Sequence, residues 1–446
     1  MTKFGKSIDF RVTGGRKLRG SITTNTSKNG AMALIASALL NKGKTTLHNT
    51  PKIEEVHRII EVLKSIGVKV DWRKNNSLEI APPKNQKFNL NKIDFEAAVK
   101  TRSVIMFIGP LLAHLHEFKI PNAGGCKMGN RTILAHKYGL EELGVKVKTQ
   151  EDFYDISCQK LKNNREVVMY EAGDTAIINI ILAAASIPKE TTISFASSNY
   201  QVQDACYFLQ ALGISVKGIG TSTLKIIGVE RGSISQDMEY YCSEDPIESM
   251  MFIASAIMTD SLLEIKRCPI DFIKLELYKL EKMGLKYSVS EKYKAKNNKT
   301  DLVDVTVKPS KLKAPYEKIH SLPYPGINVD NLPFFVPIAT KAEGRTLIHD
   351  WMWENRAIYF TELNRLGAEI SLADPHRVFI HGPTELKPAQ VVCPPALRPA
   401  MIILVAMLSA KGESVLRNVY AIERGYEEIA KRLNKIGAKI EVIKGV

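Results

Sequence analysis

The segment LKSIGVKV (residues 63–70) decides how the chain is built, because close copies of it recur along the whole sequence. Each copy has a leucine, two further residues, an apolar residue, a glycine and then alternating apolar positions. This pattern is typical of the last turn of an amphipathic helix, a glycine at its C-terminal cap and a following strand. The six copies are LKSIGVKV (63–70), LEELGVKV (140–147), LQALGISV (209–216), LEKMGLKY (280–287), LNRLGAEI (363–370) and LNKIGAKI (433–440).

A second pattern alternates with the first and also occurs six times. It is an apolar helix rich in small residues that runs through a polar turn into a strand. Alanine and serine on these helices predict close packing inside the protein rather than exposure on its surface. The six segments are LIASALLNKGKTTLHN (34–49), FIGPLLAHLHEFKIPN (107–122), IILAAASIPKETTISFAS (180–197), FIASAIMTDSLLEIKR (252–267), FVPIATKAEGRTLIHD (335–350) and ILVAMLSAKGESVLRN (403–418).

Together the two patterns define a helix–strand–helix–strand unit of about 70–80 residues, repeated six times. Solenoid repeats are shorter, roughly 20–50 residues, so we expect two pseudo-symmetric α/β domains of three units each. We place the first domain at residues 24–242. The second comprises residues 1–23 and 243–446, because the strand IDFRVTG (8–14) precedes the first unit and is free to complete it. A ligand is expected in the cleft between the domains.

Composition excludes several classes of protein. With 446 residues, 45% hydrophobic and 24% charged, the chain has the balance of a globular protein rather than a disordered or collagen-like one. Apolar runs such as Met401–Ala410 are shorter than the roughly 18–20 residues of a membrane span, and the N-terminus lacks the apolar stretch of a secretory signal. The scattered cysteines (Cys126, Cys158, Cys206, Cys242, Cys268 and Cys393) predict neither a disulfide framework nor a zinc site, so we expect a cytoplasmic protein.

The net charge of +15 is compatible with nucleic acid, a membrane surface or polyanionic substrates as partners. No block of lysine and arginine with interleaved aromatic residues occurs. We therefore interpret most of the lysines as a solvated surface and expect neither nucleic acid nor membrane as a partner.

Glycine and basic residues concentrate in NAGGCKMGNR (122–131), which we interpret as a candidate lid. Positive charge from Lys127 and Arg131 favours a thiolate at Cys126 or tunes it as a proton donor. The alternative is an inert cysteine buried in a turn.

Other charged residues stand at the predicted starts of helices. Thr26 or Ser27 is a plausible N-cap, which places Lys28 and Asn29 in a first turn where an anion is favoured. Arginine suits phosphate and carboxylate groups. Arg398 lies at the head of an apolar helix, Arg424 precedes another predicted helix, and Arg356 follows a predicted strand. Taken singly, Lys28 is equally compatible with a surface lysine, each arginine with a surface ion pair, and Asp330 in PYPGINVDNLPFF (323–335) with a helix cap.

Taken together, these residues resemble the enolpyruvyl transferase family from about Phe10 to Lys444. The matching motifs are SKN (27–29), KTR (100–102), GGCKMGNR (124–131), Asp330 after PYPGINV (323–329), ENR (354–356), LR (397–398) and ERGYE (423–427). The resemblance implies a fold of two inverse α/β-barrel domains, each of three βαβαββ units. It also implies addition–elimination between phosphoenolpyruvate and the 3′-hydroxyl of UDP-N-acetylglucosamine, the first committed step of peptidoglycan synthesis, with neither a metal nor an organic cofactor.

The resemblance also implies roles for individual residues. Lys28, Arg131, Arg398 and Arg424 correspond to the residues that bind phosphoenolpyruvate, with Lys28 and Arg424 also counted as catalytic. Cys126 corresponds to the lid cysteine that fosfomycin alkylates, and Asp330 to the aspartate that faces the acceptor hydroxyl. Asn29, Arg102, Asp330 and Arg356 are the implied acceptor-binding residues.

Departures from the family pattern concern the acceptor. Leu134 stands where an aspartate helps to read uracil, Asp174 lies roughly where a serine is expected, and Ala396 replaces an aspartate before Leu-Arg. A divergent cell-wall enzyme explains these changes. So does a paralogue that uses another nucleotide or sugar, such as UMP, or a non-catalytic nucleotide-binding paralogue.

Overall fold

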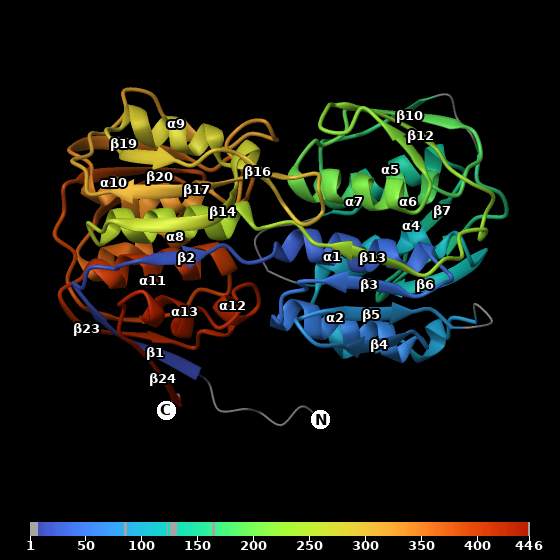
Figure 1. The fold of residues 1–446 in the computed structure, drawn as a ribbon, viewed down its shortest axis with the longest axis horizontal. Helices are drawn as coiled ribbons and strands as arrows, with labels where there is room; N and C mark the ends of the chain where they lie inside the picture. The colour runs from blue at the N-terminus through green and yellow to red at the C-terminus, as the bar shows by residue number, and fades with distance from the viewer. Residues whose placement is uncertain (1–7, 84–86, 123, 125–131, 163–165, 445–446) are drawn as a thin grey trace.

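The computed structural model describes residues 8–83, 87–122, 124, 132–162 and 166–444. It contains two lobes that lie side by side (Figure 1). Each lobe has its own hydrophobic core: one core draws on residues between Met32 and Cys242, and the other on Phe10–Ile22, Tyr200 and residues from Ile247 to Ile440. The described residues include no helix with both the length and the apolar character that a membrane span needs.

Three small sheets surround the first core. Their hydrogen-bonded strand orders are β13-β3-β5-β4, β6-β8-β7 and β11-β12-β10-β9. The strands are β3 (Thr45–His48), β4 (Lys69–Trp72), β5 (Leu78–Ala81), β6 (Glu117–Pro121), β7 (Lys146–Thr149), β8 (Phe153–Ser157), β9 (Glu166–Val168), β10 (Glu190–Ser194), β11 (Ser215–Lys217), β12 (Thr223–Ile227) and β13 (Met238–Tyr241).

Three further sheets surround the second core, in the orders β22-β23-β1-β24, β15-β17-β14-β2 and β18-β19-β21-β20, with β16 paired to β17. The strands are β1 (Ile8–Gly14), β2 (Ser21–Thr23), β14 (Leu263–Pro269), β15 (Lys286–Val289), β16 (Tyr293–Lys294), β17 (Asp301–Lys308), β18 (Ile319–His320), β19 (Gly344–His349), β20 (Glu369–Asp374), β21 (Arg377–Gly382), β22 (Gln390–Val392), β23 (Gly412–Arg417) and β24 (Ile440–Lys444). In five of the six sheets one edge pair is parallel and the other named pairs are antiparallel. This arrangement agrees with the predicted mixed α/β units.

The helices rich in small residues lie inside each lobe, as predicted. In the first lobe α6 (Asp174–Ala184) contacts α1 (Lys28–Ser37) and α4 (Ile108–Leu111), and in the second α8 (Pro246–Met258), α10 (Phe335–Lys341) and α11 (Leu397–Ser409) contact one another. Every residue of α8 is buried, because alanine and serine allow neighbouring backbones to approach closely.

The remaining helices carry the first repeated pattern or connect the units. They are α2 (Glu54–Ser65), α3 (Phe95–Ala98), α5 (Leu134–Glu142), α7 (Tyr200–Ala211), α9 (Lys274–Lys282), α12 (Tyr420–Glu423), α13 (Ile429–Lys435) and the 3₁₀ segments η1 (Ala38–Leu40), η2 (Leu90–Lys92), η3 (Arg102–Phe107), η4 (Ile270–Phe272), η5 (Leu332–Phe334) and η6 (Ala357–Leu366). The six repeat glycines all have positive φ, from +82° to +104°, a backbone conformation that favours glycine after a helix. The predicted caps are therefore confirmed.

The chain crosses between the lobes twice, and the two crossings lie against each other. The amide of Ser27 donates to the carbonyl of Ser243 over 2.8 Å, and the amide of Asp245 donates to the carbonyl of Asn25 over 2.9 Å. We propose these crossings as the domain boundaries, at 23/24 and 242/243. Both crossings lead directly into a buried helix, α1 or α8, so they fix how the beginnings of these two helices face each other.

Candidate functional site

A cavity of about 630 Å³ is lined by residues from both lobes. The first lobe contributes residues of α1, α2, η3, α5, α6 and α7. The second contributes the loop before η5, the segment 351–356, the beginning of α11 and Arg424 directly after α12. Most of the sequence-predicted residues line this one cavity: Lys28, Asn29, Arg102, Asp330, Arg356, Arg398 and Arg424.

Lys28 is positioned by the first turn of α1. The hydroxyl of Ser27 accepts a hydrogen bond from the amide of Gly30 over 3.0 Å, so Ser27 is the N-cap and Thr26, the other residue proposed from the sequence, is not. The Lys28 amide donates to the carboxylate of Asp245 over 3.4 Å. Burial lowers the pKa of the Lys28 ammonium, and the cations Arg398 and Arg424 add to that effect against the opposing charges of Glu55 and Asp330.

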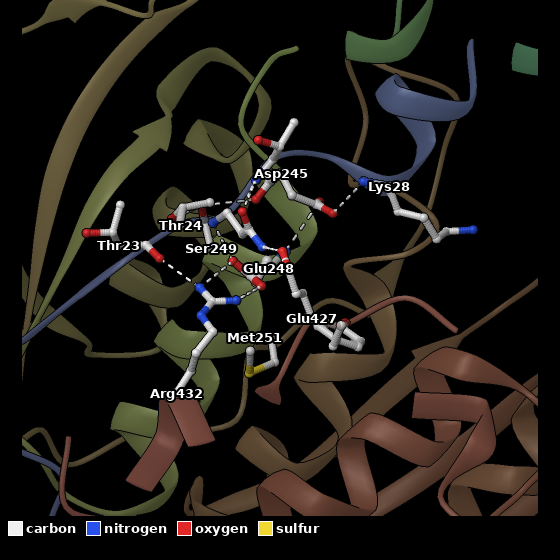
Figure 2. A network of polar contacts seen from close by, with 12 residues as sticks. Thr23, Thr24, Lys28, Asp245, Glu248, Ser249, Met251, Glu427 and Arg432 are labelled. Carbon is white, nitrogen blue, oxygen red and sulfur yellow. Dashed lines mark hydrogen bonds and ion pairs between the residues drawn. The ribbon is translucent and has the colours of Figure 1, made fainter. Parts of the chain in front are cut away.

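The strand leading to Lys28 is anchored to the second lobe by a polar network (Figure 2). Buried Glu248 accepts hydrogen bonds from the guanidinium of Arg432 and, over 2.5 Å, from the backbone amide of Asn25. The hydroxyls of Thr24 and Ser249 lie 2.9 Å apart. Figure 2 shows the Lys28 side chain extending away from this network, which therefore holds the backbone of Lys28 and leaves its ammonium to other partners.

Glu55 in the first turn of α2 lies between cations. Its carboxylate accepts hydrogen bonds from Arg424 Nη2 over 2.8 Å and from the Thr101 hydroxyl over 2.6 Å. Burial by itself raises the pKa of Glu55, but the charges of Lys28 and Arg424 and these hydrogen bonds lower it overall. Glu55 therefore joins Lys28 of one helix and Arg424 of the other lobe into one charged cluster.

Asp330 is a carboxylate on the second-lobe wall of the cavity. Its Oδ2 accepts a hydrogen bond from Arg398 Nη2 over 3.1 Å. The alternative prediction of a helix cap is wrong, because the N-cap of η5 is Asn331. Arg398 lies in the first turn of α11, is only 5% exposed, and also donates to the Tyr426 hydroxyl over 2.8 Å. Burial opposes ionisation of Asp330, but Arg398, Arg356 and Lys28 lower its pKa below the ordinary value, so it stays a carboxylate.

Arg356, an implied acceptor-binding residue, makes its hydrogen bonds to residues of its own lobe. It is 1% exposed and donates to both oxygens of Asp350, over 2.5 and 2.9 Å, and to the carbonyl of Val329 over 2.7 Å. Its Nη1 lies 3.9 Å from Asp330 Oδ1. The arrangement therefore fixes the backbone just before Asp330, and we interpret Arg356 chiefly as a residue that positions Asp330.

Asn29, Arg102 and Asp174 line the cavity from the first lobe. Asn29 donates to the Tyr200 hydroxyl over 3.0 Å, and Arg102 donates to the carbonyl of Thr132 over 2.9 Å. Asp174, at the beginning of α6, accepts hydrogen bonds from Ser197 and Asn199, and Glu171 lies three residues before it on the same wall. Burial raises the pKa of Asp174, and the charge of Asp330 raises it further.

Cys126, Lys127 and Arg131 lie outside the described residues, so their predicted roles are carried by the sequence alone. Among the described residues, no group of three or more His, Cys, Asp or Glu is arranged to hold a metal ion. Sequence reasoning missed Glu55, Asp350 and Gln201 as lining or supporting residues. Glu54 and Glu55 at the start of α2 have the negative charge that commonly complements a helix dipole, so the sequence gives no sign of a further role for Glu55. Nothing in the local sequence around Asp350 or Gln201 indicates what these residues contact.

Comparison with known proteins places this geometry in context. Residues 12–433 match the family model of EPSP synthase (3-phosphoshikimate 1-carboxyvinyltransferase). A protein of Bradyrhizobium diazoefficiens named UDP-N-acetylglucosamine 1-carboxyvinyltransferase is 34% identical over 438 residues, covering 97% of this chain and 98% of its own. A protein of the same name from Treponema denticola is also 34% identical, over 97% of this chain and 99% of its own.

Solved structures with similar folds include the enolpyruvyl transferase NikO from Streptomyces tendae. Its TM-score is 0.84 at 20% identity, over 99% of this chain and 100% of its own. EPSP synthase from Acinetobacter baumannii has a TM-score of 0.76 at 17% identity, over 98% of this chain and 100% of its own. At these identities the likeness concerns the fold, and it confirms the predicted two-domain architecture.

Proposed function

The chain belongs to the EPSP synthase family of enolpyruvyl transferases, and from that premise we propose that it transfers the enolpyruvyl group of phosphoenolpyruvate to the 3′-hydroxyl of UDP-N-acetylglucosamine, releasing phosphate. The observation that carries the proposal is the convergence of Lys28, Arg398 and Arg424 on one cavity that also presents Asp330. The names of the full-length relatives support this acceptor.

Phosphoenolpyruvate explains why several cations gather here. It carries a phosphate and a carboxylate on three carbons, so a pocket that binds it needs fixed positive charges on more than one side. Lys28, Arg398 and Arg424 come from α1, α11 and the residue after α12, in both lobes. Glu55 accepts a hydrogen bond from Arg424 and Asp330 accepts one from Arg398, so two carboxylates position these two arginines. Arg131 adds a fourth cation in the proposal.

The reaction we propose has two steps. In the first, the acceptor oxygen forms a bond to C2 of phosphoenolpyruvate while a proton reaches C3, giving a tetrahedral ketal. In the second, the bond from C2 to the phosphate oxygen breaks, phosphate leaves, and C3 loses a proton. Asp330, kept ionised by its arginines, accepts the proton of the acceptor hydroxyl, and Cys126 supplies the proton to C3.

The acceptor end of the cavity favours a second candidate, transfer to a different nucleotide or sugar such as UMP. The resemblance implies a uracil-reading aspartate where this chain has Leu134. Glu171 and Asp174 place carboxylates in the cavity wall. Carboxylates repel phosphate groups, so this wall fits an acceptor whose phosphates lie elsewhere.

A phosphate-release assay separates these candidates. Phosphoenolpyruvate is incubated with the enzyme and, separately, with UDP-N-acetylglucosamine, UMP or shikimate 3-phosphate. We expect release with UDP-N-acetylglucosamine. Release with UMP alone contradicts the proposed acceptor and supports the second candidate.

A further inference from the structure

Gln201, in the first turn of α7, has an oxygen that the protein leaves unused. The residue is 6% exposed and lines the cavity. Its Oε1 is buried and has no hydrogen-bond partner among the described residues. A buried hydrogen-bond acceptor without a donor costs desolvation free energy. At the wall of a cavity, a bound ligand can supply the missing donor.

The other half of the same amide is firmly held. Gln201 Nε2 donates to Oδ2 of Asp174, which also accepts from Asn199 over 3.0 Å, while the Ser197 hydroxyl donates to Oδ1 over 2.5 Å. A carboxylate only accepts hydrogen bonds, so it fixes which end of the Gln201 amide turns toward it. The nitrogen faces Asp174, and Oε1 is therefore the end left for a donor.

From this juxtaposition we propose that Gln201 is a specificity-determining residue whose Oε1 accepts a hydrogen bond from a hydroxyl or N–H group of the acceptor substrate. The proposal rests on the proposed function and deepens it. A site built to accept one hydrogen bond rejects analogues that lack the matching donor, because the buried oxygen is then left unpaired.

The chemistry of the same wall restricts which part of the acceptor lies there. Asp174 and Glu171 line the cavity beside Gln201, and a phosphate placed among them meets two carboxylates and an acceptor oxygen. A neutral part of the acceptor, either a sugar with its hydroxyl and amide groups or a base with its N–H groups, satisfies Oε1 without that repulsion.

Gln201→Met tests the proposal because methionine keeps the length of the side chain and removes the oxygen. The control is Gln203→Met on the same helix, since Gln203 donates to the carbonyl of Ser198 and does not line this cavity. We expect the Kd of UDP-N-acetylglucosamine, measured by calorimetry, to rise about tenfold or more in Gln201→Met, with the KM of phosphoenolpyruvate within about twofold of wild type. Gln203→Met should bind like wild type.

Acceptor analogues that each lack one hydroxyl or N–H group identify the donor. For the analogue that lacks this donor, the Kd with wild type should match the Kd of Gln201→Met with the complete acceptor. The Kd of Gln201→Met for that analogue should be no higher than its Kd for the complete acceptor. Gln201→Ala replaces Gln201→Met if the latter does not give folded protein. Wild-type turnover of UDP-N-acetylglucosamine combined with an unchanged Kd in whichever Gln201 variant is used overturns this proposal alone. Absence of wild-type turnover with every acceptor contradicts the proposed function instead.

Discussion

Arg398 Nη2 donates a hydrogen bond to Oδ2 of Asp330 over 3.1 Å, which joins the first turn of α11 to the loop before η5. The same guanidinium is fixed by the Tyr426 hydroxyl. Asp330 is thus held by a buried cation that cannot rotate freely, and its pKa is lowered although burial opposes ionisation. A carboxylate in this state can receive a proton only if the donor is brought against it, which is what binding of the acceptor hydroxyl would do.

Asp330→Asn should abolish that proton transfer. The amide keeps the size of the side chain but does not accept a proton, so we expect turnover to fall by about 10²–10⁴-fold, the usual contribution of a general base. Phosphoenolpyruvate should still bind, as judged by calorimetry. Asp374→Asn, which alters an exposed ion pair with Arg377, is the control. Turnover of Asp330→Asn within a few-fold of wild type would remove Asp330 from the mechanism.

Lys28 should impose an alkaline limit on activity. Its pKa is lowered, chiefly by burial, so its charge is lost as pH rises through a value below the ordinary 10.5. We expect kcat/KM for phosphoenolpyruvate to decline in that range. Lys28→Arg keeps a charge at every accessible pH, so the decline should move to higher pH even if the variant is slower overall. If kcat/KM declines over the same alkaline pH range in wild type and in Lys28→Arg, the decline belongs to a group other than Lys28.

Glu55→Gln should weaken folding and strengthen anion binding at once. Removing the carboxylate leaves Lys28 and Arg424 without their shared counter-charge, a loss we place at about 3 kcal/mol of unfolding free energy at neutral pH. Because the pKa of Glu55 is lowered in the folded protein, its stabilisation is present above the ordinary value of 4.5 and is lost as pH falls through the lowered pKa. The difference in unfolding free energy between Glu55→Gln and wild type should therefore become smaller at acidic pH.

The same variant should gain more thermal stability from phosphoenolpyruvate than wild type does, since the anion replaces the missing negative charge. Thermal unfolding with and without phosphoenolpyruvate measures this. An equal or smaller shift in Glu55→Gln would show that Glu55 does not share its cations with the ligand.

Cys126 should be the thiol that electrophiles reach. Cys158, Cys206, Cys242, Cys268 and Cys393 are all buried, and burial raises the pKa of each thiol, to about 12 for Cys206, Cys268 and Cys393. Thiols with such pKa values react slowly, because the thiolate is the nucleophile. Fosfomycin should therefore add once, at Cys126, as read by intact mass and peptide mapping.

Substitutions at Cys126 test its role as the acid. Cys126→Ser should greatly slow turnover, because a hydroxyl is far less acidic than a thiol. Cys126→Asp can deliver the same proton and should keep activity while resisting fosfomycin. Full activity in Cys126→Ser, or alkylation at another cysteine, would leave Cys126 as a turn residue.

The architecture follows from local sequence because its signals are local. Each repeat glycine, such as Gly67 or Gly437, adopts positive φ after a helix, and the alanine- and serine-rich segments become the buried helices. Both features depend on residues within a few positions of one another. Periodicity and capping chemistry are therefore sufficient to find them.

The functional site can be predicted only in part from local sequence. Arg424 and Glu55 are 369 positions apart, and their contact exists only because the two lobes meet at the cavity. Asp174 and Gln201 come together because α6 and α7 pack in one lobe. Asp174 stands out in the sequence only as a departure from the family pattern, and Gln201 lies in none of the motifs. Lys28, Asp330, Arg398 and Arg424 are candidates from their local sequence context, and the family resemblance implies their roles. The residues that hold or complement them require the fold.

The most direct test of the central claim is to run the reaction in D₂O with phosphoenolpyruvate and UDP-N-acetylglucosamine and to analyse the nucleotide product by mass spectrometry and proton NMR. Addition–elimination passes through a methyl group at C3 that takes a solvent deuteron and then loses one of its hydrogens. The account predicts an enolpyruvyl ether of UDP-N-acetylglucosamine carrying deuterium in its vinyl group, formed together with phosphate. An enolpyruvyl ether without deuterium, or phosphate release without any enolpyruvyl product, would contradict it.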